Sequence, residues 1–402
     1  MNPDVYHPSS HAISHDLIDP DALYIIEHLR ARGHLAYLVG GSVRDLLIKK
    51  RPKDFDISTS ARPEEIKKVF GKRCLLIGRR FRLAHVRAGK KIFEVSTFRS
   101  GSTDSDDLIV NDNVWGSEEE DVLRRDFTIN GLYYDPTEHT VLDYVGGWDD
   151  VQKNVLRTIG PAYSRFNQDP VRMIRLLKFQ SRLNFSVDPE ALQALERCKH
   201  SITLSAPARI LEEVMRMLES GASKPFFELM AKHEFIEMLF PWLQHFLEGT
   251  RGEITYSYLD HADKINQNRR YYPLDRGVLL CCLLYPILES EIDKQFIQKG
   301  HSPHLGQLTE LTFSLIKAII TSSFSHFPKK LSSSAATILL NQFKLTPYAR
   351  RSYPPNKMLS NKEIKYSIYF LRIRSLVNPQ LNESYEHWNS LLERKKLAHH
   401  EH

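Results

Sequence analysis

Two aspartates separated by one residue are the feature of this chain with the clearest chemistry. Asp54 and Asp56 lie on either side of Phe55 in the segment KDFDIS. In an extended strand, residues two apart point to the same face, so both carboxylates would face one side while Phe55 and Ile57 face a core. Paired carboxylates repel each other unless a cation lies between them, and Mg²⁺ accepts both carboxylate and phosphate oxygens. The spacing therefore predicts an Mg²⁺ site.

A glycine pair lies shortly before these aspartates. Gly40 and Gly41 stand between a short apolar run and the start of a helix, in the segment LVGGSVRDLL. Because glycine has no Cβ, backbone N–H groups there can approach a triphosphate at the helix N-terminus. A phosphate-binding turn beside a paired-carboxylate metal site predicts nucleotidyl transfer.

Further charged residues follow in strand-like and helix-like segments. Glu94 alternates with apolar residues in KKIFEVSTFR, so it is either a third carboxylate near the aspartates or a solvated side chain. Arg124 and Arg125 are adjacent in VLRRDF, and two guanidinium groups can bind phosphate or ribose oxygens bidentately. Asp126, the next residue, is either another acid near the metal or a structural partner of an arginine.

A third group opens the helical half of the chain, in the segment QDPVRMIR. Asp169 precedes Pro170, a favourable residue for a first helical turn, so helix capping would explain Asp169 without any function. Arg172 and Arg175 are three residues apart and would share one helix face, from which they could reach a base or phosphates.

The surrounding pattern predicts the elements that hold these residues. Helices are expected over 21–33 and 63–70, and strands over 35–39, 54–58, 74–77, 82–87 and 91–98. Residues 1–16 and 100–117 are polar and lack periodicity, so we expect a mobile N-terminus and a loop. From residue 171 onward, apolar residues recur at helical spacing, without comparable strand patterns as far as residue 332. The fold class is therefore α+β at the N-terminus, with a mixed sheet and helices, followed by an all-α region.

Length and composition limit the class of protein. With 402 residues, of which 42% are hydrophobic and 26% charged, the chain is expected to form two or three globular domains. It contains no apolar run of membrane-spanning length and no signal-peptide pattern, so we expect an intracellular, cytoplasmic protein without a membrane partner. The four cysteines lack metal-ligand spacing, and structural disulfides are not expected.

The C-terminal part is basic. Residues 327–402 contain 13 Lys and Arg against 5 Asp and Glu, with Phe370, Trp388 and several tyrosines between them. Such a pattern suits an RNA backbone and its unstacked bases, although a solvated basic tail beside an ordinary helix would look the same. The predicted nucleotidyl-transfer site favours RNA binding.

Taken in order, these segments resemble the class II tRNA nucleotidyltransferase and bacterial poly(A) polymerase family, of the polymerase β superfamily. The motifs that carry the resemblance are GGSVRDLL with DFD, EVSTFR, RRDFTINGL, DYVGGWDD and DPVRMIR, within about residues 37–220. The resemblance implies two Mg²⁺ ions at Asp54 and Asp56, Glu94 as a third carboxylate and Asp126 as a further active-site acid. It also implies that Asp169 and Arg172 read the edge of the incoming base, although Gln168 replaces the usual leading glutamate. A later helix motif matches at Arg209 and Glu213.

The implied architecture has four parts after a flexible N-terminus over 1–16. These parts are a catalytic head over 17–160, a helical neck over 161–225 that binds the nucleotide base and RNA, a helical body over 226–328, and a basic RNA-binding tail over 329–402. As a mechanistic hypothesis, Gly40, Gly41, Ser42 and Arg44 position the β- and γ-phosphates of ATP. The RNA 3′ end would then attack the α-phosphorus and gain one nucleotide.

Two subfamilies share this chemistry. Poly(A) polymerases extend RNA with AMP, whereas CCA-adding enzymes restore tRNA 3′ ends from CTP and ATP. The segment LLIGRRFRLAHV over 75–86 resembles a signature of the poly(A) polymerases, which we therefore favour. An RNA-binding protein with a vestigial site is the non-enzymatic alternative, and the intact Asp54, Asp56, Glu94 and Arg172 argue against it. A P-loop NTPase is excluded because the chain lacks the Gly-x4-Gly-Lys-Ser/Thr pattern.

Overall fold

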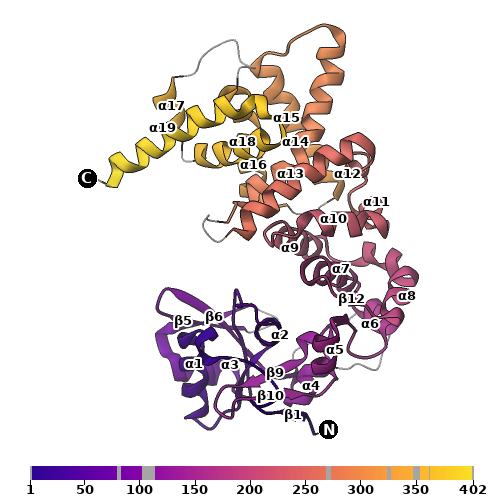
Figure 1. The fold of residues 1–402 in the computed structure, drawn as a ribbon, viewed down its shortest axis with the longest axis vertical. Coiled ribbons are helices and arrows are strands. Elements are labelled where there is room, and N and C mark those ends of the chain that lie inside the picture. The colour runs from indigo at the N-terminus through magenta and orange to yellow at the C-terminus, as the bar shows by residue number, and fades with distance from the viewer. Residues whose placement is uncertain are drawn as a thin grey trace. The chain divides into compact units, whose positions relative to one another are not determined.

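A computed structural model describes residues 2–78, 83–101, 114–268, 273–323, 327–346, 354–361 and 363–400. The chain divides into two compact units (Figure 1). The first unit contains residues 1–180 and 184–202, and the second contains residues 181–183 and 203–402. The segment predicted as a neck, 161–225, is thus shared between the units. We describe each unit separately.

An eight-stranded mixed sheet forms the centre of the first unit. Its strand order is β1-β10-β9-β2-β3-β6-β5-β4, and β3 with β6 is the parallel pair, whereas the other neighbours run antiparallel. The strands are β1 (Asp4–Tyr6), β2 (Ala36–Val39), β3 (Asp56–Thr59), β4 (Cys74–Ile77), β5 (Leu83–Ala88), β6 (Lys91–Thr97), β9 (Leu132–Asp135) and β10 (Thr140–Asp143). All five predicted strands are confirmed, with ends that differ by one or two residues.

Short strands account for three differences from the prediction. Strand β1 pairs with β10 at the edge of the large sheet, so part of the segment 1–16, for which no element was predicted, has regular structure. Within the predicted loop over 100–117, β7 (Arg99–Ser100) pairs with β8 (Val114–Trp115). In the predicted all-helical region, β12 (Ser186–Val187) pairs with β11 (Val155–Leu156). Strands of two or three residues are too short to show a two-residue period.

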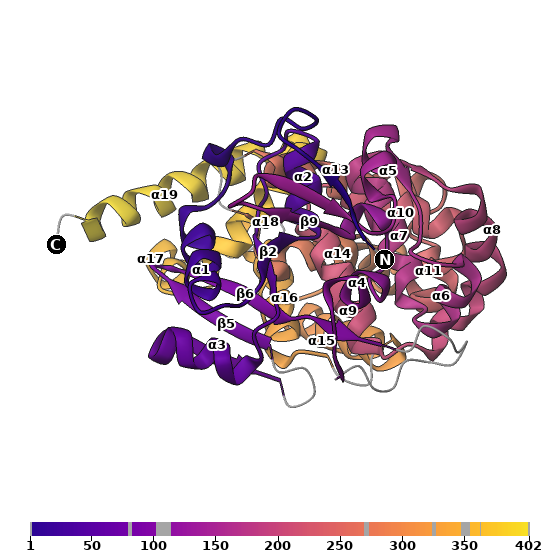
Figure 2. The ribbon, with the colours of Figure 1, turned by 90° about the horizontal axis from the view of Figure 1, so that it is seen from below.

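Helices α1 and α3 pack against one face of the sheet (Figure 2). Both helices begin within one residue of the predicted start. The side chain of Asp19 caps α1 by accepting a hydrogen bond from the backbone N–H of Asp21, and both helices have proline in the first turn. The helices of the first unit are α1 (Pro20–Arg30), α2 (Gly41–Leu47), α3 (Pro63–Phe70), α4 (Glu118–Leu123), α5 (Gly147–Lys153), α6 (Ala162–Gln168), α7 (Val171–Leu183) as far as Gln180, and α8 (Pro189–Cys198).

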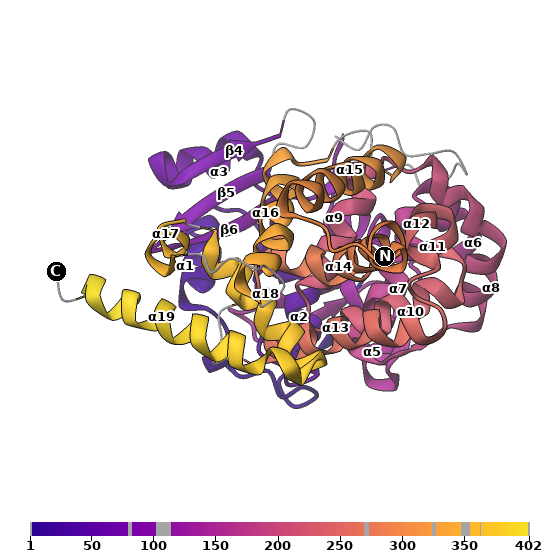
Figure 3. The same cartoon turned by 90° about the horizontal axis from the view of Figure 1, so that it is seen from above.

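The second unit is helical in its described residues, as predicted. The contacts of α14 with α13 and α16, and of α18 with α16 and α19, build its core (Figure 3). Its helices are α9 (Pro207–Leu218), α10 (Ser223–Lys232), α11 (Phe235–Leu239), α12 (Pro241–Gln244), α13 (Gly249–Gln267), α14 (Arg276–Gln295), α15 (Leu305–Ser323), α16 (Lys329–Leu345), α17 (Pro355–Leu359), α18 (Ile364–Val377) and α19 (Asn382–His400). Among the helices of the described residues, none is long and apolar enough to cross a membrane.

Candidate active site

The two aspartates lie at the start of β3, on the open face of the sheet. Strand β3 begins at Asp56 rather than at Asp54, but the predicted alternation is confirmed, since Asp54 and Asp56 are exposed. Phe55 and Ile57 are 8% and 0% exposed, respectively. Burial of the two apolar side chains fixes the backbone, so both carboxylates face solvent.

Glu94 lies beside Asp56 on the neighbouring strand. The Ile57–Val95 pair in the parallel β3–β6 ladder places Asp56 and Glu94 one step earlier in the same register. Val95 is fully buried like Ile57, so Glu94 lies on the exposed face together with Asp56. The Glu94 carboxylate approaches His85 on β5, with 3.7 Å between Oε1 and Nε2.

The donor set of this face fits Mg²⁺. In the described ranges, no three His, Cys, Asp or Glu side chains converge closely enough to hold an ion. Mg²⁺ commonly takes only one or two protein carboxylates and fills its other positions with water and substrate phosphates. Asp54 and Asp56 can supply those two carboxylates, and Glu94 is at present oriented to His85.

The glycine turn precedes α2. Gly40 has φ 69° and ψ −126°, a conformation that favours glycine, and its N–H donates to the carbonyl of Leu132. Ser42 is buried, and its hydroxyl donates to the carbonyl of Val39 at 3.0 Å. The Ser42 side chain therefore closes the turn from inside, which leaves its backbone N–H as the group that a phosphate could meet.

Arg44 does not project into solvent as the phosphate-binding hypothesis requires. Its side chain is 2% exposed, and its guanidinium donates to Asp45 at 2.7 Å and to Asn130 at 2.6 Å. The same group lies over the ring of Phe179. A Cβ on Gly41 would be 3.4 Å from Arg44 Nη2, so the Arg44 charge lies directly beneath the glycine turn. In this conformation the Arg44 side chain is too buried to contact a phosphate directly.

Arg125 connects the glycine turn with the aspartates. Its Nη1 would be 3.5 Å from a Cβ on Gly40, and its Nη2 donates to Ser58 at 3.2 Å. Burial lowers the pKa of Arg125, but the charge of Asp121 and its hydrogen bond raise the pKa further than burial lowers it. Arg125 therefore places a basic group between the glycine turn and the strand that carries Asp56, where one triphosphate could meet both.

Asp121 holds both predicted arginines and was missed by the sequence analysis. Its side chain is fully buried and accepts hydrogen bonds from Arg124 at 2.8 Å, Arg125 at 2.7 Å and Tyr133 at 2.9 Å. Burial raises the pKa of Asp121, but the two arginines outweigh burial and lower it to about 2. Asp121 lies on α4, three and four residues before the two arginines, and this spacing could have predicted the ion pairs from the sequence.

Asp126 has an arginine partner, as the second of its two interpretations predicts, and its role as an active-site acid stays a prediction. Its carboxylate is 9% exposed and lies 2.6 Å from Arg175. It also accepts hydrogen bonds from Asn130 and from the backbone of Phe127. Burial raises its pKa, whereas Arg175 and these donors lower it to about 2. This buried pair also orients Arg175, whose side chain is 36% exposed.

Arg172 and a second missed residue, Arg165, join α6 and α7 to the arginine pair. Arg172 donates to the carbonyls of Arg165 and Arg124, and Arg165 donates to the carbonyl of Arg125. Burial and the nearby Arg172 lower the pKa of Arg165 to about 10. These bonds bring Arg124, Arg125, Arg165 and Arg172 into one cluster, which Arg175 joins through Asp126. The five arginines of this cluster outnumber the carboxylates of Asp121 and Asp126 that pair with them, a charge balance suited to an anion.

Asp169 does not cap α7, so the capping explanation is wrong. The residue that precedes the helix is Pro170, which makes no side-chain cap, and Asp169 instead ends α6. Its half-buried carboxylate raises the pKa of Arg165, which places it at the edge of the arginine cluster. The role in base reading therefore stays a prediction.

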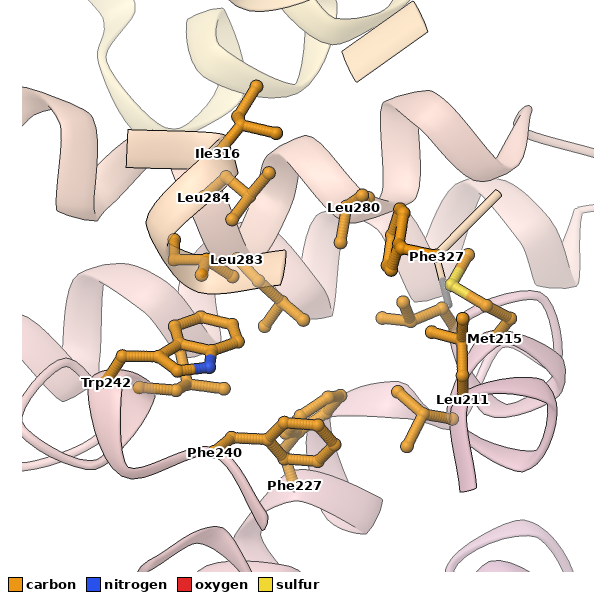
Figure 4. A pocket seen from close by; sticks show the side chains of 14 residues that line it. Leu211, Met215, Phe227, Phe240, Trp242, Leu280, Leu283, Leu284, Ile316 and Phe327 are labelled. Carbon is orange, nitrogen blue, oxygen red and sulfur yellow. The ribbon is translucent and has the colours of Figure 1, made fainter. Parts of the chain in front are cut away.

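Arg209 is exposed on α9 in the second unit, so its relation to the site of the first unit stays a prediction. A pocket in the same unit is lined by apolar side chains, including Leu211, Met215, Trp242 and Phe327 (Figure 4). The side chains that line this pocket offer no acid, base or nucleophile, and the indole N–H of Trp242 is a hydrogen-bond donor.

Two of the C-terminal aromatic residues, Phe370 and Trp388, are not available for stacking on bases. Phe370 is fully buried, and Trp388 is 7% exposed with its Nε1 donating to the carbonyl of Leu345. Trp388 belongs to an apolar cluster with Leu359 and Leu371, so its role is to hold the C-terminal helices together. The prediction that RNA bases stack on Phe370 and Trp388 is therefore wrong.

Two segments of the chain match known families. Residues 36–157 match the family described as the poly A polymerase head domain, and residues 184–247 match the probable RNA and SrmB-binding site of polymerase A. By these matches and the relatives described below, the chain is similar to the class II nucleotidyltransferase family. The segment over 79–82, which contains Arg79 and Arg80 of the poly(A) polymerase signature, lies outside the described residues.

Relatives of both subfamilies are similar to the chain. Poly(A) polymerase I of Salmonella typhi is 38% identical over 295 residues, which are 69% of this chain and 63% of the relative. The CCA-adding enzyme of Enterococcus faecalis is 37% identical over 213 residues, 52% of each chain. The solved CCA-adding enzyme of Bacillus stearothermophilus in complex with CTP has a TM-score of 0.65 at 22% identity, over 94% of this chain and 83% of that one. The last likeness confirms the fold, an α+β head followed by helices.

Proposed function

We propose that the chain is a template-independent polynucleotide adenylyltransferase that adds AMP from ATP to RNA 3′ ends. The observation that carries this proposal is the position of Arg125, which lies against the Gly40 turn and donates a hydrogen bond to Ser58 on the strand that carries Asp56. A triphosphate at the turn would therefore lie beside the carboxylates that bind metal. The matched relatives favour adenylyl transfer over other nucleotidyl transfers, and the chain covers 63% of the Salmonella relative.

The side chains divide the work of the reaction. Asp54 and Asp56 would hold Mg²⁺, which supplies charge that activates the RNA 3′-hydroxyl and stabilises the leaving pyrophosphate. Backbone N–H groups of Gly41 and Ser42 would bind the β- and γ-phosphates, with the buried charge of Arg44 beneath them. Arg125 neutralises phosphate charge at the face that also carries the acids, which orients the α-phosphorus for in-line attack.

The second set of residues would select the nucleotide. Asp169 is half-buried at the edge of the arginine cluster, where its carboxylate can accept a hydrogen bond from the amino group of adenine. Arg172 holds α6 and α7 in place through two backbone carbonyls, so its effect on base choice would be partly through orientation. Arg124 and Arg175 add positive charge for the triphosphate, and Arg209 adds a contact for RNA. We place the activity in the cytoplasm, where ATP and RNA 3′ ends meet.

CCA addition is the second candidate, because CCA-adding enzymes are also similar to the chain in sequence and fold. Both candidates use the same acids and the same turn, so their difference lies in the nucleotide and the RNA. The discriminating experiment supplies labelled ATP or labelled CTP, with Mg²⁺, to an oligo(A) and to a tRNA truncated at its 3′ end. Long products from ATP on both RNAs support the proposal, whereas CTP followed by a single A, only on tRNA, supports CCA addition.

Two substitutions test the assignment of the acids. Asp54→Asn and Asp56→Asn should each reduce incorporation by about 10³-fold, because each removes a charge that faces the metal. Both carboxylates are exposed, so thermal unfolding should remain unchanged. Asp149→Asn is the matched control, because Asp149 is an exposed aspartate paired with Lys153 on α5. Wild-type incorporation by both variants would refute the assignment.

A further inference from the structure

Three strands present one row of polar side chains on the open face of the sheet. Asp56 on β3 lies abreast of Glu94 on β6, and Glu94 lies directly opposite His85 on β5. Residues paired across neighbouring strands point to the same face and have backbones about 5 Å apart. Glu94 therefore stands between an aspartate of the candidate metal site and a histidine.

The two members of the Glu94–His85 pair differ in mobility. The Glu94 side chain is 56% exposed, so burial does not restrict its three torsions. His85 is only 25% exposed, and it is flanked on β5 by Ala84 and Val86, which are 0% and 1% exposed. Burial of these flanking residues anchors the strand, which makes the imidazole the more rigid member of the pair.

The observed contact shows which way Glu94 turns. Its Oε1 lies 3.7 Å from His85 Nε2, on the side of the residue away from Asp56. The absence of a three-ligand cluster among the described residues agrees with this orientation. Without His85, the Glu94 side chain would sample many rotamers, and in few of them would its carboxylate face the RNA 3′ end.

We propose that His85 is a positioning residue, which holds the Glu94 carboxylate in one orientation on the β5 side of the row and so prepares it for the RNA 3′ end. The inference rests on the proposed function, since it concerns the acids of that site. His85 acts through Glu94 and makes no contact with the nucleotide. The Gly40 turn and Arg125 bind the triphosphate, so loss of His85 should change the rate of transfer and leave ATP binding unaffected.

The test is a double-mutant cycle on the two residues, with single-turnover rates measured at excess enzyme so that slow variants remain measurable. His85→Ala should lower the rate by about fivefold, as expected for a partly exposed pair, with KM for ATP unchanged. His85→Gln, whose amide N–H can approach the Glu94 carboxylate from a side chain of similar length, should restore most of the rate. In a Glu94→Ala background, His85→Ala should have no further effect.

Arg87→Ala provides the matched control. Arg87 is exposed on the same face of β5, but it pairs with Ile92 rather than with Glu94, so its loss should leave the single-turnover rate at saturating RNA unchanged. Equal losses from His85→Ala with and without Glu94 would overturn the inference, as would a rate unaffected by His85→Ala. The cycle uses whichever nucleotide the wild-type chain incorporates. Failure of the wild-type chain with both nucleotides would instead overturn the proposed function, before any variant is compared.

Discussion

Replacement of Asp121 by asparagine is the sharpest test of how the arginine pair is held. The substitution keeps the size of the side chain but removes the charge that Arg124 and Arg125 share at 2.8 and 2.7 Å. The pKa of Asp121 falls from 3.8 to about 2 in the folded chain. At 1.36 kcal/mol for each pKa unit, the charged carboxylate contributes about 2 kcal/mol to the free energy of unfolding at neutral pH.

A second estimate gives a similar cost. Removal of one partner from a buried ion pair costs about 3–5 kcal/mol when the other charge is left uncompensated. Asparagine still accepts hydrogen bonds, and the arginine side chains are 20% exposed, so the lower end applies. We therefore expect a loss of about 2–3 kcal/mol, which corresponds to about 5–10 °C in the melting temperature of the first unit.

The pH dependence supplies the internal check. A carboxylate with a lowered pKa stabilises the fold above its unfolded pKa, and that stability disappears as pH falls from about 4 through the folded value of about 2. The difference between wild type and Asp121→Asn should thus be constant near pH 7 and shrink between pH 4 and pH 2. Asp126 has a similarly lowered pKa in both proteins, so its contribution cancels from the comparison.

Calorimetry or urea unfolding would measure these differences, with Asp149→Asn as the matched control. Asp149 forms a surface ion pair with Lys153 at 3.0 Å, and both side chains are more than 60% exposed, so its loss should cost less than about 0.5 kcal/mol. Equal losses from the two substitutions would refute the reasoning. So would a difference between wild type and Asp121→Asn that does not change between pH 4 and pH 2.

Two further substitutions test the packing around the site and in the second unit. Gly147→Ala should cost about 3 kcal/mol in urea unfolding, because a Cβ there would overlap the backbone carbonyl of Thr128. Gly146→Ala, which meets open space but has a positive φ, should cost only about 1 kcal/mol, and equal costs would contradict the close approach. Trp388→Phe should cost about 1–2 kcal/mol, since it leaves a buried carbonyl without its donor, but RNA affinity measured by fluorescence anisotropy should not change. A selective loss of RNA affinity would restore the stacking role.

Much of the first unit follows from local pattern. The alternation around Asp54 and Asp56 is visible in four consecutive residues, because burial of Phe55 and Ile57 leaves the acids only one face. The glycine turn is equally local, since the positive φ of Gly40 needs a residue without Cβ. Helix starts such as that of α1 depend on neighbours within one turn.

Tertiary packing decided what those residues touch. Arg44 and Arg125 look alike in the sequence, yet one is 2% exposed beneath the turn and the other lies beside it, because Asn130 and Asp121 attract them to different sides. The pairing of Asp126 with Arg175 joins the bend after α4 to α7, which no local period reveals.

The basic C-terminal part shows the same limit. Trp388 could bind RNA or fill a core as far as its sequence context shows, and the packing of α16, α18 and α19 makes it part of the core. The sequence by itself thus determined which groups can do chemistry and on which face of their own element they lie. Only the tertiary structure decided which of these groups remain accessible, because burial and long-range ion pairs depend on elements distant in the chain.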